Sequence, residues 1–337
     1  MKPKKLLETV TLQIMNKLNT LLVSAPGVGK TDIVGQAVKA AGARCAVFHP
    51  AVSDPTDYKG FPWCMADESG GTSASFVTFG ELKVLQEAEE LTVAFFDDIG
   101  QAREATQNAL MQLVWGRSIN GKQVSDNVMF IAATNRRADR SGVSGMTEAL
   151  KSRFVTIINA ETSVPDWCNW ANTNGMPSDL IYFIRSNPNL LHDFQPTTEI
   201  ANTPSPRTVA SFGTLLNTGY TVDEDFEVLA GAAGPAFAVQ FKSYMQIARK
   251  VPDMQAMLDN PSSVTDMPTD PAILFHMAMQ LTRLAHLDNI EPVLECLGRF
   301  PSEFGAYVIN DVRVLVPEIE HTASFQRWRM ANQEMFV

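Results

Sequence analysis

The sequence predicts a three-layer α/β domain, with a parallel sheet between two layers of helices, followed by an all-helical remainder. Two observations lead to this fold class. Short, continuously apolar segments alternate with helical patterns in the first half of the chain, and strand signals stop near Val164. Continuous apolar runs are typical of parallel strands covered on both faces, and the alternation implies right-handed crossovers. The predicted strands are 20–24, 45–50, 91–97, 128–133 and 154–158, and the predicted helices between them are 31–41, 80–90 and 103–115.

Three parts are expected along the chain. The α/β domain takes residues 1–160 and includes hairpin insertions. A helical domain, punctuated by Pro and Gly-Asn, takes residues 161–258. Residues 259–337 begin with a Pro/Ser/Asp-rich linker (259–271) and continue as a further helical segment, in which Met277 and Phe300 are expected to be core residues.

Composition narrows the class of protein. The 337 residues carry a formal net charge of −10, so the chain has no general attraction for nucleic acid or anionic membranes. The N-terminal segment is predicted to be an amphipathic helix rather than a signal peptide, and no apolar run is long enough to span a membrane. The four cysteines are scattered without a CxxC pair, which favours reduced thiols and a cytoplasmic protein; they are Cys45, Cys64, Cys168 and Cys296.

A glycine-containing loop, "SAPGVGKT" (24–31), joins the first predicted strand to the next helix. Its glycines allow backbone N–H groups to turn inward as an anion nest at the positive end of that helix. Lys30 can reach the β- and γ-phosphates of a nucleotide, and the Thr31 hydroxyl can ligate Mg²⁺. A strand–turn–helix with a surface lysine is the alternative. The residues expected to contact the nucleotide here are Pro26, Gly27, Val28, Gly29, Lys30, Thr31 and Asp32.

The strand "LTVAFF" ends in two carboxylates, Asp97 and Asp98. Carboxyl ends of parallel strands face the same crevice as the phosphate loop. Asp97 is therefore expected to support Mg²⁺, and Asp98 to polarise the water that attacks the γ-phosphorus. Taken alone, the pair could be a turn or a helix cap.

In this order the motifs resemble those of AAA+ ATPases, and most closely the MoxR branch of chaperone-like ATPases. The resemblance implies an extra strand between the two phosphate-site strands, and "VMFIAATN" fits it, with Asn135 as a sensor that orients water. It also implies that Arg153 in "MTEALKSRF" is an arginine finger acting on a neighbouring subunit, and that Arg207 in "TPSPRTV" opens a lid-domain helix and contacts the nucleotide. The alternatives are a simple turn at Asn135, a dipole-compensating surface arginine at 153, and an ordinary Pro-Arg helix start at 207.

Two stretches favour the MoxR branch and two positions depart from the family pattern. Residues 54–82 suit an inserted hairpin with a polar, Gly-rich middle, and Asn120-Gly121 is a strong hairpin signal just before the sensor strand. For both stretches, the alternative is a surface hairpin with no role in function. Ser24 replaces the usual glycine, and Asp98 replaces the usual glutamate, which affects the expected hydrolysis rate more than binding. Arg136 and Arg137 are taken as a solvated patch or as further nucleotide contacts.

The resemblance implies an enzyme that converts ATP and water to ADP and phosphate with Mg²⁺, in a hexameric ring of identical chains. It implies remodelling of a client or adaptor protein, such as one with a von Willebrand factor A domain. An AAA+ motor or loader acting on nucleic acid, a slow-turnover nucleotide-gated scaffold and a small-molecule kinase remain alternatives. Neither nucleic acid nor a membrane is an expected partner.

Overall fold

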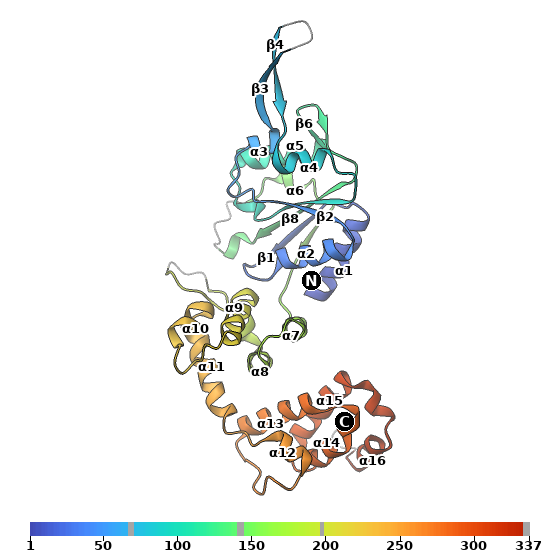
Figure 1. Ribbon diagram of the computed structural model, residues 1–337, viewed down its shortest axis with the longest axis vertical. Coiled ribbons are helices and arrows are strands. Elements are labelled where there is room, and N and C mark those ends of the chain that lie inside the picture. Colours follow the sequence, from blue (N-terminus) through green and yellow to red (C-terminus); the bar gives the residue numbers. More distant parts are fainter. Residues whose placement is uncertain (67–70, 140–144, 196–198, 333–337) are drawn as a thin grey trace. The chain divides into compact units, whose positions relative to one another are not determined.

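The computed structural model describes residues 1–66, 71–139, 145–195 and 199–332. The chain divides into two compact units, Met1–Phe237 and Ala238–Val337, and the division falls within helix α11 (Pro235–Ala248). Figure 1 labels many of the helices and strands of both units. The domain boundaries expected from the sequence, after residues 160 and 258, remain predictions.

The first unit is built on a five-stranded sheet with the order β2-β5-β8-β1-β9, in which every neighbouring pair is parallel. This confirms the predicted three-layer α/β fold class. Strand β8 lies between β5 and β1, as the resemblance implies. The strands are β1 (Thr20–Ser24), β2 (Arg44–Phe48), β5 (Thr92–Phe96), β8 (Val128–Asn135) and β9 (Thr156–Asn159).

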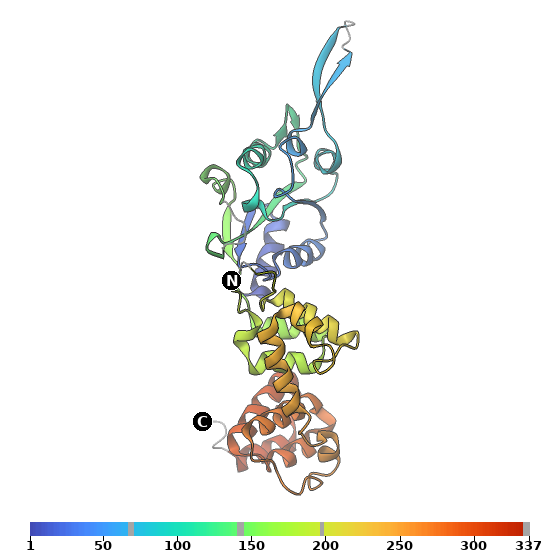
Figure 2. The same ribbon diagram turned by 90° about the vertical axis from the view of Figure 1, so that its left-hand side faces the viewer.

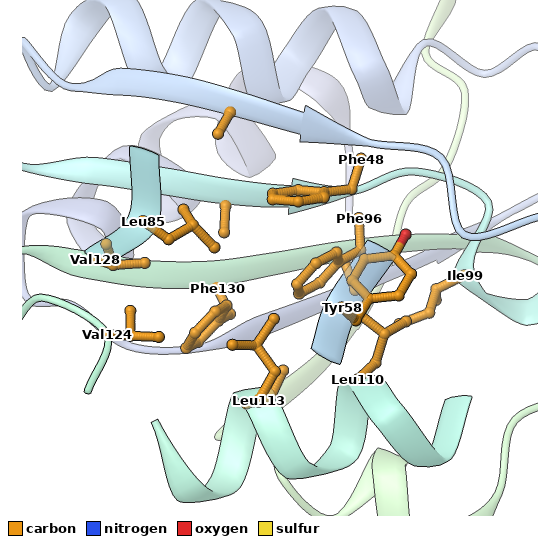
Figure 3. Packing of buried hydrophobic residues seen from close by; sticks show 14 of the residues in the cluster. Phe48, Tyr58, Leu85, Phe96, Ile99, Leu110, Leu113, Val124, Val128 and Phe130 are labelled. Carbon is orange, nitrogen blue, oxygen red and sulfur yellow. The ribbon is translucent and has the colours of Figure 1, made fainter. Parts of the chain in front are cut away.

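Side chains of adjacent strand residues point to opposite faces of the sheet and so build two separate cores. Phe95 packs in the cluster that contains the buried residues of α1 and α2, whereas Phe96 packs in the cluster of α3, α4 and α5. In the second cluster the Phe96 and Phe130 rings stack with centroids 5.9 Å apart (Figure 3). The helices are α1 (Pro3–Met15), α2 (Lys30–Ala40), α3 (Thr56–Lys59), α4 (Gly80–Gln86), α5 (Glu104–Gly116) and α6 (Glu148–Lys151).

Two hairpins interrupt this core at the places where the sequence predicts insertions. The first pairs β3 (Phe61–Ala66) with β4 (Thr72–Val77) in antiparallel register and projects away from the sheet (Figures 1 and 2). Its expected polar middle includes residues 67–70, which lie outside the described residues. The second pairs β6 (Ser118–Ile119) with β7 (Lys122–Gln123) around Asn120 and Gly121, both with positive φ. The Asn120 amide donates to the carbonyl of Lys59, which joins the second hairpin to the end of α3, just before the first hairpin begins.

The rest of the first unit is helical. Phe237 is buried in this part, with its ring edge-on to Phe183 and Phe212 at centroid distances of 5.3 and 5.1 Å. Ser163 and Ser205 cap two of the helices, each followed closely by a proline in the first turn. The helices are α7 (Val164–Thr173), α8 (Ser178–Ser186), α9 (Pro206–Asn217) and α10 (Phe226–Ala233).

The second unit is a helical bundle with its own apolar core. Met277, Val293 and Phe325 are fully buried in it, and Phe300 nearly so. Its helices beyond α11 are α12 (Met254–Asp259), α13 (Pro271–Leu284), α14 (Ile290–Leu297), α15 (Ser302–Leu315) and α16 (Ala323–Ala331). In the described ranges of both units, no helix combines the length and apolar character that crossing a membrane requires.

Candidate active site

The phosphate loop begins where β1 ends at Ser24 and runs into α2 at Lys30. Gly27 and Gly29 have φ values of 72° and 97°, in the region that glycine adopts most readily. Gly27 also has no room for a side chain, because a β-carbon there would lie 2.4 Å from Ser205 Oγ. The loop therefore takes the backbone course that a phosphate cradle at a helix N-terminus needs.

Lys30 is buried at the start of α2, with only 7% of its surface exposed. Its Nζ donates to Asn135 Oδ1 at 2.7 Å and to Ser24 Oγ at 2.9 Å. Burial lowers the pKa of Lys30 to about 8, although the nearby Asp98 and Asp97 carboxylates act to raise it. Because it is buried and hydrogen-bonded, Lys30 is not the surface lysine of the alternative interpretation.

The sheet register explains why Asn135 and the loop meet. Ser24 at the end of β1 lies directly opposite Asn135 at the end of β8. The backbone N–H of Arg136 then donates to the Ser24 carbonyl at 3.1 Å, which extends the pairing past the strand ends. Arg136 itself is exposed, and the side chain of Arg137 lies outside the described residues. Two segments about 110 positions apart thus place their polar groups at one point.

The two carboxylates after β5 take different positions. Asp97 Oδ2 accepts a hydrogen bond from Thr31 Oγ1 at 2.7 Å, which brings two hard oxygen ligands together beside the loop. Asp98 has a φ of 53°, and its Oδ1 accepts from Asn135 Nδ2 at 3.4 Å. Burial, followed by the neighbouring Asp97 charge, raises the pKa of the Asp98 carboxyl. Aspartate tolerates this left-handed backbone better than glutamate does, which gives a physical reason for the departure from the family pattern.

The hydroxyl of Thr31 and the carboxylate of Asp97 fit Mg²⁺, which prefers oxygen ligands and keeps several waters. A nucleotide-bound Mg²⁺ takes its other ligands from phosphate oxygens and water, so two protein groups are enough. Among the described residues, no three or more His, Cys, Asp or Glu side chains are grouped so that they could hold a metal ion.

Arg207 lies next to the loop in the first turn of α9. Its backbone N–H donates to the Gly27 carbonyl at 3.1 Å. Ser205 and Thr208 form a capping box that fixes this helix start, with Pro206 at the first position. The positive charge of Arg207 acts to lower the pKa values of Lys30 and Asp98, but in Asp98 burial and the Asp97 charge outweigh it.

Arg153 is held elsewhere. It follows α6, and its guanidinium carbon lies 5.0 Å from the ring centroid of Trp115 on α5. Its Nε is buried and has no hydrogen-bond acceptor among the residues that the structure describes. The structure thus brings Ser24, Lys30, Thr31, Asp97, Asp98 and Asn135 into one hydrogen-bonded cluster, places Arg207 beside the loop, and leaves Arg153 against α5 instead.

A cavity of about 530 Å³ adjoins the loop and was not predicted from the sequence. Its walls come from α1, α2, α7 and α9, and it has the size and mainly apolar lining of a small-ligand site. Trp167 and Trp170, three residues apart on α7, are the sequence signal that could have indicated it. The lining includes Leu7, Gly27, Val28, Gly29, Asp32, Ile33, Trp167, Trp170, Met176, Pro206, Arg207 and Ala210.

This arrangement can hold a triphosphate on backbone N–H groups and one buried cation, support Mg²⁺, and polarise a water beside the γ-phosphate. The fold and the site together define a P-loop nucleotide-binding domain with the AAA+ architecture. In agreement, residues 19–154 match the family model described as AAA domain (dynein-related subfamily).

No curated protein matches the chain by sequence. Among solved structures, Thermotoga maritima RuvB, a Holliday junction branch migration motor, is 16% identical, with a TM-score of 0.41 over 86% of this chain and 85% of that one. A mutant form of the same RuvB is 15% identical with a TM-score of 0.43, covering 87% of this chain and 85% of that chain. NtrX from Brucella abortus in complex with ADP is 13% identical, with a TM-score of 0.41 over 99% of this chain and 68% of that one. These similarities are too weak to support an argument about function.

Proposed function

We propose that the chain is an ATPase that hydrolyses ATP to ADP and phosphate and works as a ring of identical copies. One observation carries the proposal: polar groups from the ends of three neighbouring strands, β1, β8 and β5, meet the start of α2 in one hydrogen-bonded cluster. Burying a lysine among two carboxylates and an amide is costly for a purely structural site. It is the composition that phosphoryl transfer to water requires.

The residues take separate roles in hydrolysis. Lys30 would exchange its bonds to Asn135 and Ser24 for the β- and γ-phosphate oxygens, where its charge stabilises the transferring group. Thr31 and Asp97 would hold Mg²⁺, which supplies further neutralisation of phosphate charge when bound. Asn135 would orient the attacking water, and Asp98 would accept its proton. The raised pKa of Asp98 suits a group that must take up a proton during turnover.

The cavity beside the loop would hold the nucleoside, since it opens at Gly27–Gly29 and is mainly apolar. Arg207 would link α9 to the nucleotide state, because its N–H already bonds the loop at Gly27. Arg153 would act on the nucleotide of a neighbouring copy. Its contact with α5, rather than with its own loop, supports a role in trans.

The work done by hydrolysis is proposed to be remodelling of a client or adaptor protein, as in the MoxR branch, whose partners often carry a von Willebrand factor A domain. The two inserted hairpins support this branch. An AAA+ motor or loader on nucleic acid is disfavoured by the net charge of −10. A slow-turnover, nucleotide-gated scaffold is the second candidate, favoured by the short Asp98 side chain.

The decisive experiment compares two lysines of the same helix. Lys30→Ala removes the buried cation and should abolish both ATP binding and turnover. Lys39→Ala removes an exposed cation from the last turn of α2 and should change neither. Binding is followed with a fluorescent ATP analogue and turnover by phosphate release. Undiminished affinity in Lys30→Ala would refute the assignment of the loop.

A further inference from the structure

Trp115 is an exposed tryptophan near the end of α5, a helix that buries one face and exposes the other. The two residues before it, Leu113 and Val114, are in the core, whereas Trp115 has 68% of its surface exposed. An indole left in solvent forgoes the free energy that burial would supply. The indole ring of Trp115 lies against the guanidinium of Arg153.

Arg153 is fixed in place by its neighbours rather than by its own side-chain bonds. Leu150 is fully buried and Phe154 nearly so, and the N–H of Arg153 donates to the Leu150 carbonyl at 3.1 Å. Buried Gln107 on α5 holds the start of this segment, accepting from the Thr147 N–H at 3.0 Å and donating to the Gly145 carbonyl at 2.8 Å. Helices α5 and α6 therefore carry Trp115 and Arg153 as one rigid pair.

We propose that Trp115 is a positioning residue for Arg153, holding its guanidinium by stacking so that it can serve the nucleotide of a neighbouring copy. This inference rests on the proposed ATPase function. The argument is geometric: the guanidinium carbon lies 5.0 Å from the indole centroid, which is within the range of a cation–π contact.

A cation–π contact can hold the Arg153 guanidinium without using up its N–H donors, which an ion pair would do. A carboxylate partner would occupy the N–H donors of the guanidinium and cancel its charge. An indole face attracts the cation through its π-electrons and leaves the planar fork of N–H groups available for phosphate oxygens. Among the described residues, the Glu148 carboxylate on α6 pairs with Lys151 rather than with Arg153. The Arg153 Nε is buried without an acceptor, so the terminal N–H groups of the guanidinium are the ones proposed to meet phosphate oxygens.

The test uses Trp115→Ala, Trp115→Phe and Arg153→Ala in the full chain, with Met330→Ala as the control. Met330 is a large apolar residue with 72% exposure, outside the proposed machinery. We expect Trp115→Ala to keep the Kd for ATP and the thermal unfolding midpoint, and to lower kcat roughly three- to tenfold. Trp115→Phe should recover part of the loss, because a phenyl ring retains a weaker cation–π contact. Met330→Ala should match the wild type.

Subunit mixing separates this inference from the proposed function. Lys30→Ala protein retains Trp115 and Arg153, so adding it should raise the turnover of both Trp115→Ala and Arg153→Ala proteins. Recovery with Arg153→Ala but not with Trp115→Ala would overturn the positioning role alone, as would a wild-type kcat in Trp115→Ala. Recovery with neither would overturn the shared site itself, and the positioning role with it. A loss in Trp115→Phe equal to that in Trp115→Ala would also count against stacking.

Discussion

Replacing Gly27 with alanine tests how tightly the phosphate loop and α9 are joined. Gly27 has a φ of 72°, and a β-carbon there would lie 2.4 Å from Ser205 Oγ and 2.8 Å from Ser205 Cβ. Ser205 cannot easily move aside, because its side chain accepts the N–H of Thr208 and its N–H donates to the Thr208 hydroxyl. The substitution therefore combines backbone strain with a collision against a fixed residue.

Gly29 supplies the matched control. Its φ of 97° imposes a similar backbone cost, but a β-carbon there would have nothing within 4 Å. Left-handed strain alone is worth about 1–2 kcal/mol, so Gly29→Ala should lower the free energy of unfolding by about that amount. An added collision is worth about 1–3 kcal/mol, so Gly27→Ala should lower it by about 2–5 kcal/mol.

Urea unfolding of the two variants measures the difference, and a fluorescent ATP analogue shows whether binding weakens with it. A second substitution identifies the cause. Ser205→Gly removes both colliding atoms at a cost to the helix cap of a few tenths of a kcal/mol, so it should partly restore Gly27→Ala. Equal destabilisation of Gly27→Ala and Gly29→Ala, or a double variant less stable than Gly27→Ala, would refute the reasoning.

Two further substitutions test other parts of the molecule. Burial raises the pKa of Tyr58 to about 12, from the ordinary phenol value of 10, so the folded state holds this proton more tightly than the unfolded state. The protonated phenol therefore contributes its full stabilisation below pH 10, and this contribution is lost as the pH rises towards 12. Relative to Tyr58→Phe, the free energy of unfolding of the wild type, measured in urea, should fall by about 1 kcal/mol between pH 9 and 11. A difference that stays constant over this range would contradict the burial argument. Asp98→Glu should keep steady-state phosphate release within about tenfold of the wild type, since the longer carboxylate gains reach but strains a left-handed backbone; a gain of about a hundredfold or more would instead favour the slow-turnover scaffold.

Much of the first unit follows from local sequence patterns. Apolar runs at 20–24 and 128–133 indicate buried strands, and these correspond to β1 (Thr20–Ser24) and the first part of β8 (Val128–Asn135). The ends of helices and strands are predicted less well than their presence. The helix expected over 80–90 ends at Gln86 in α4. Helix propensity falls gradually along the sequence, whereas the packing that stabilises the helix ends at a definite residue. The place of β8 between β5 and β1 followed from the family resemblance, whereas the rest of the order β2-β5-β8-β1-β9 was not predicted, since hydrophobic periodicity says nothing about which strands are neighbours.

The site also contains residues that a local motif predicts and residues that only the packed structure brings together. Lys30 and Thr31 belong to a motif with a characteristic spacing, so the sequence alone is enough to predict their roles. Leu7 lines the cavity without carrying a local signal. The Trp167–Trp170 pair is a local signal, but it does not locate a cavity by itself, because the cavity exists only after α1 and α7 pack beside the loop. The cation–π contact of Arg153 with Trp115 joins positions 38 residues apart, and no pattern in either segment indicates it.

The hydrogen bond from the Arg207 amide to the Gly27 carbonyl has an experimental consequence. Its proton can exchange with solvent deuterium only when the loop and α9 separate, so the exchange rate of this single amide reports on that opening. Measuring the exchange rate of this amide without nucleotide, with ADP and with a non-hydrolysable ATP analogue would show how strongly each ligand holds the loop and α9 together.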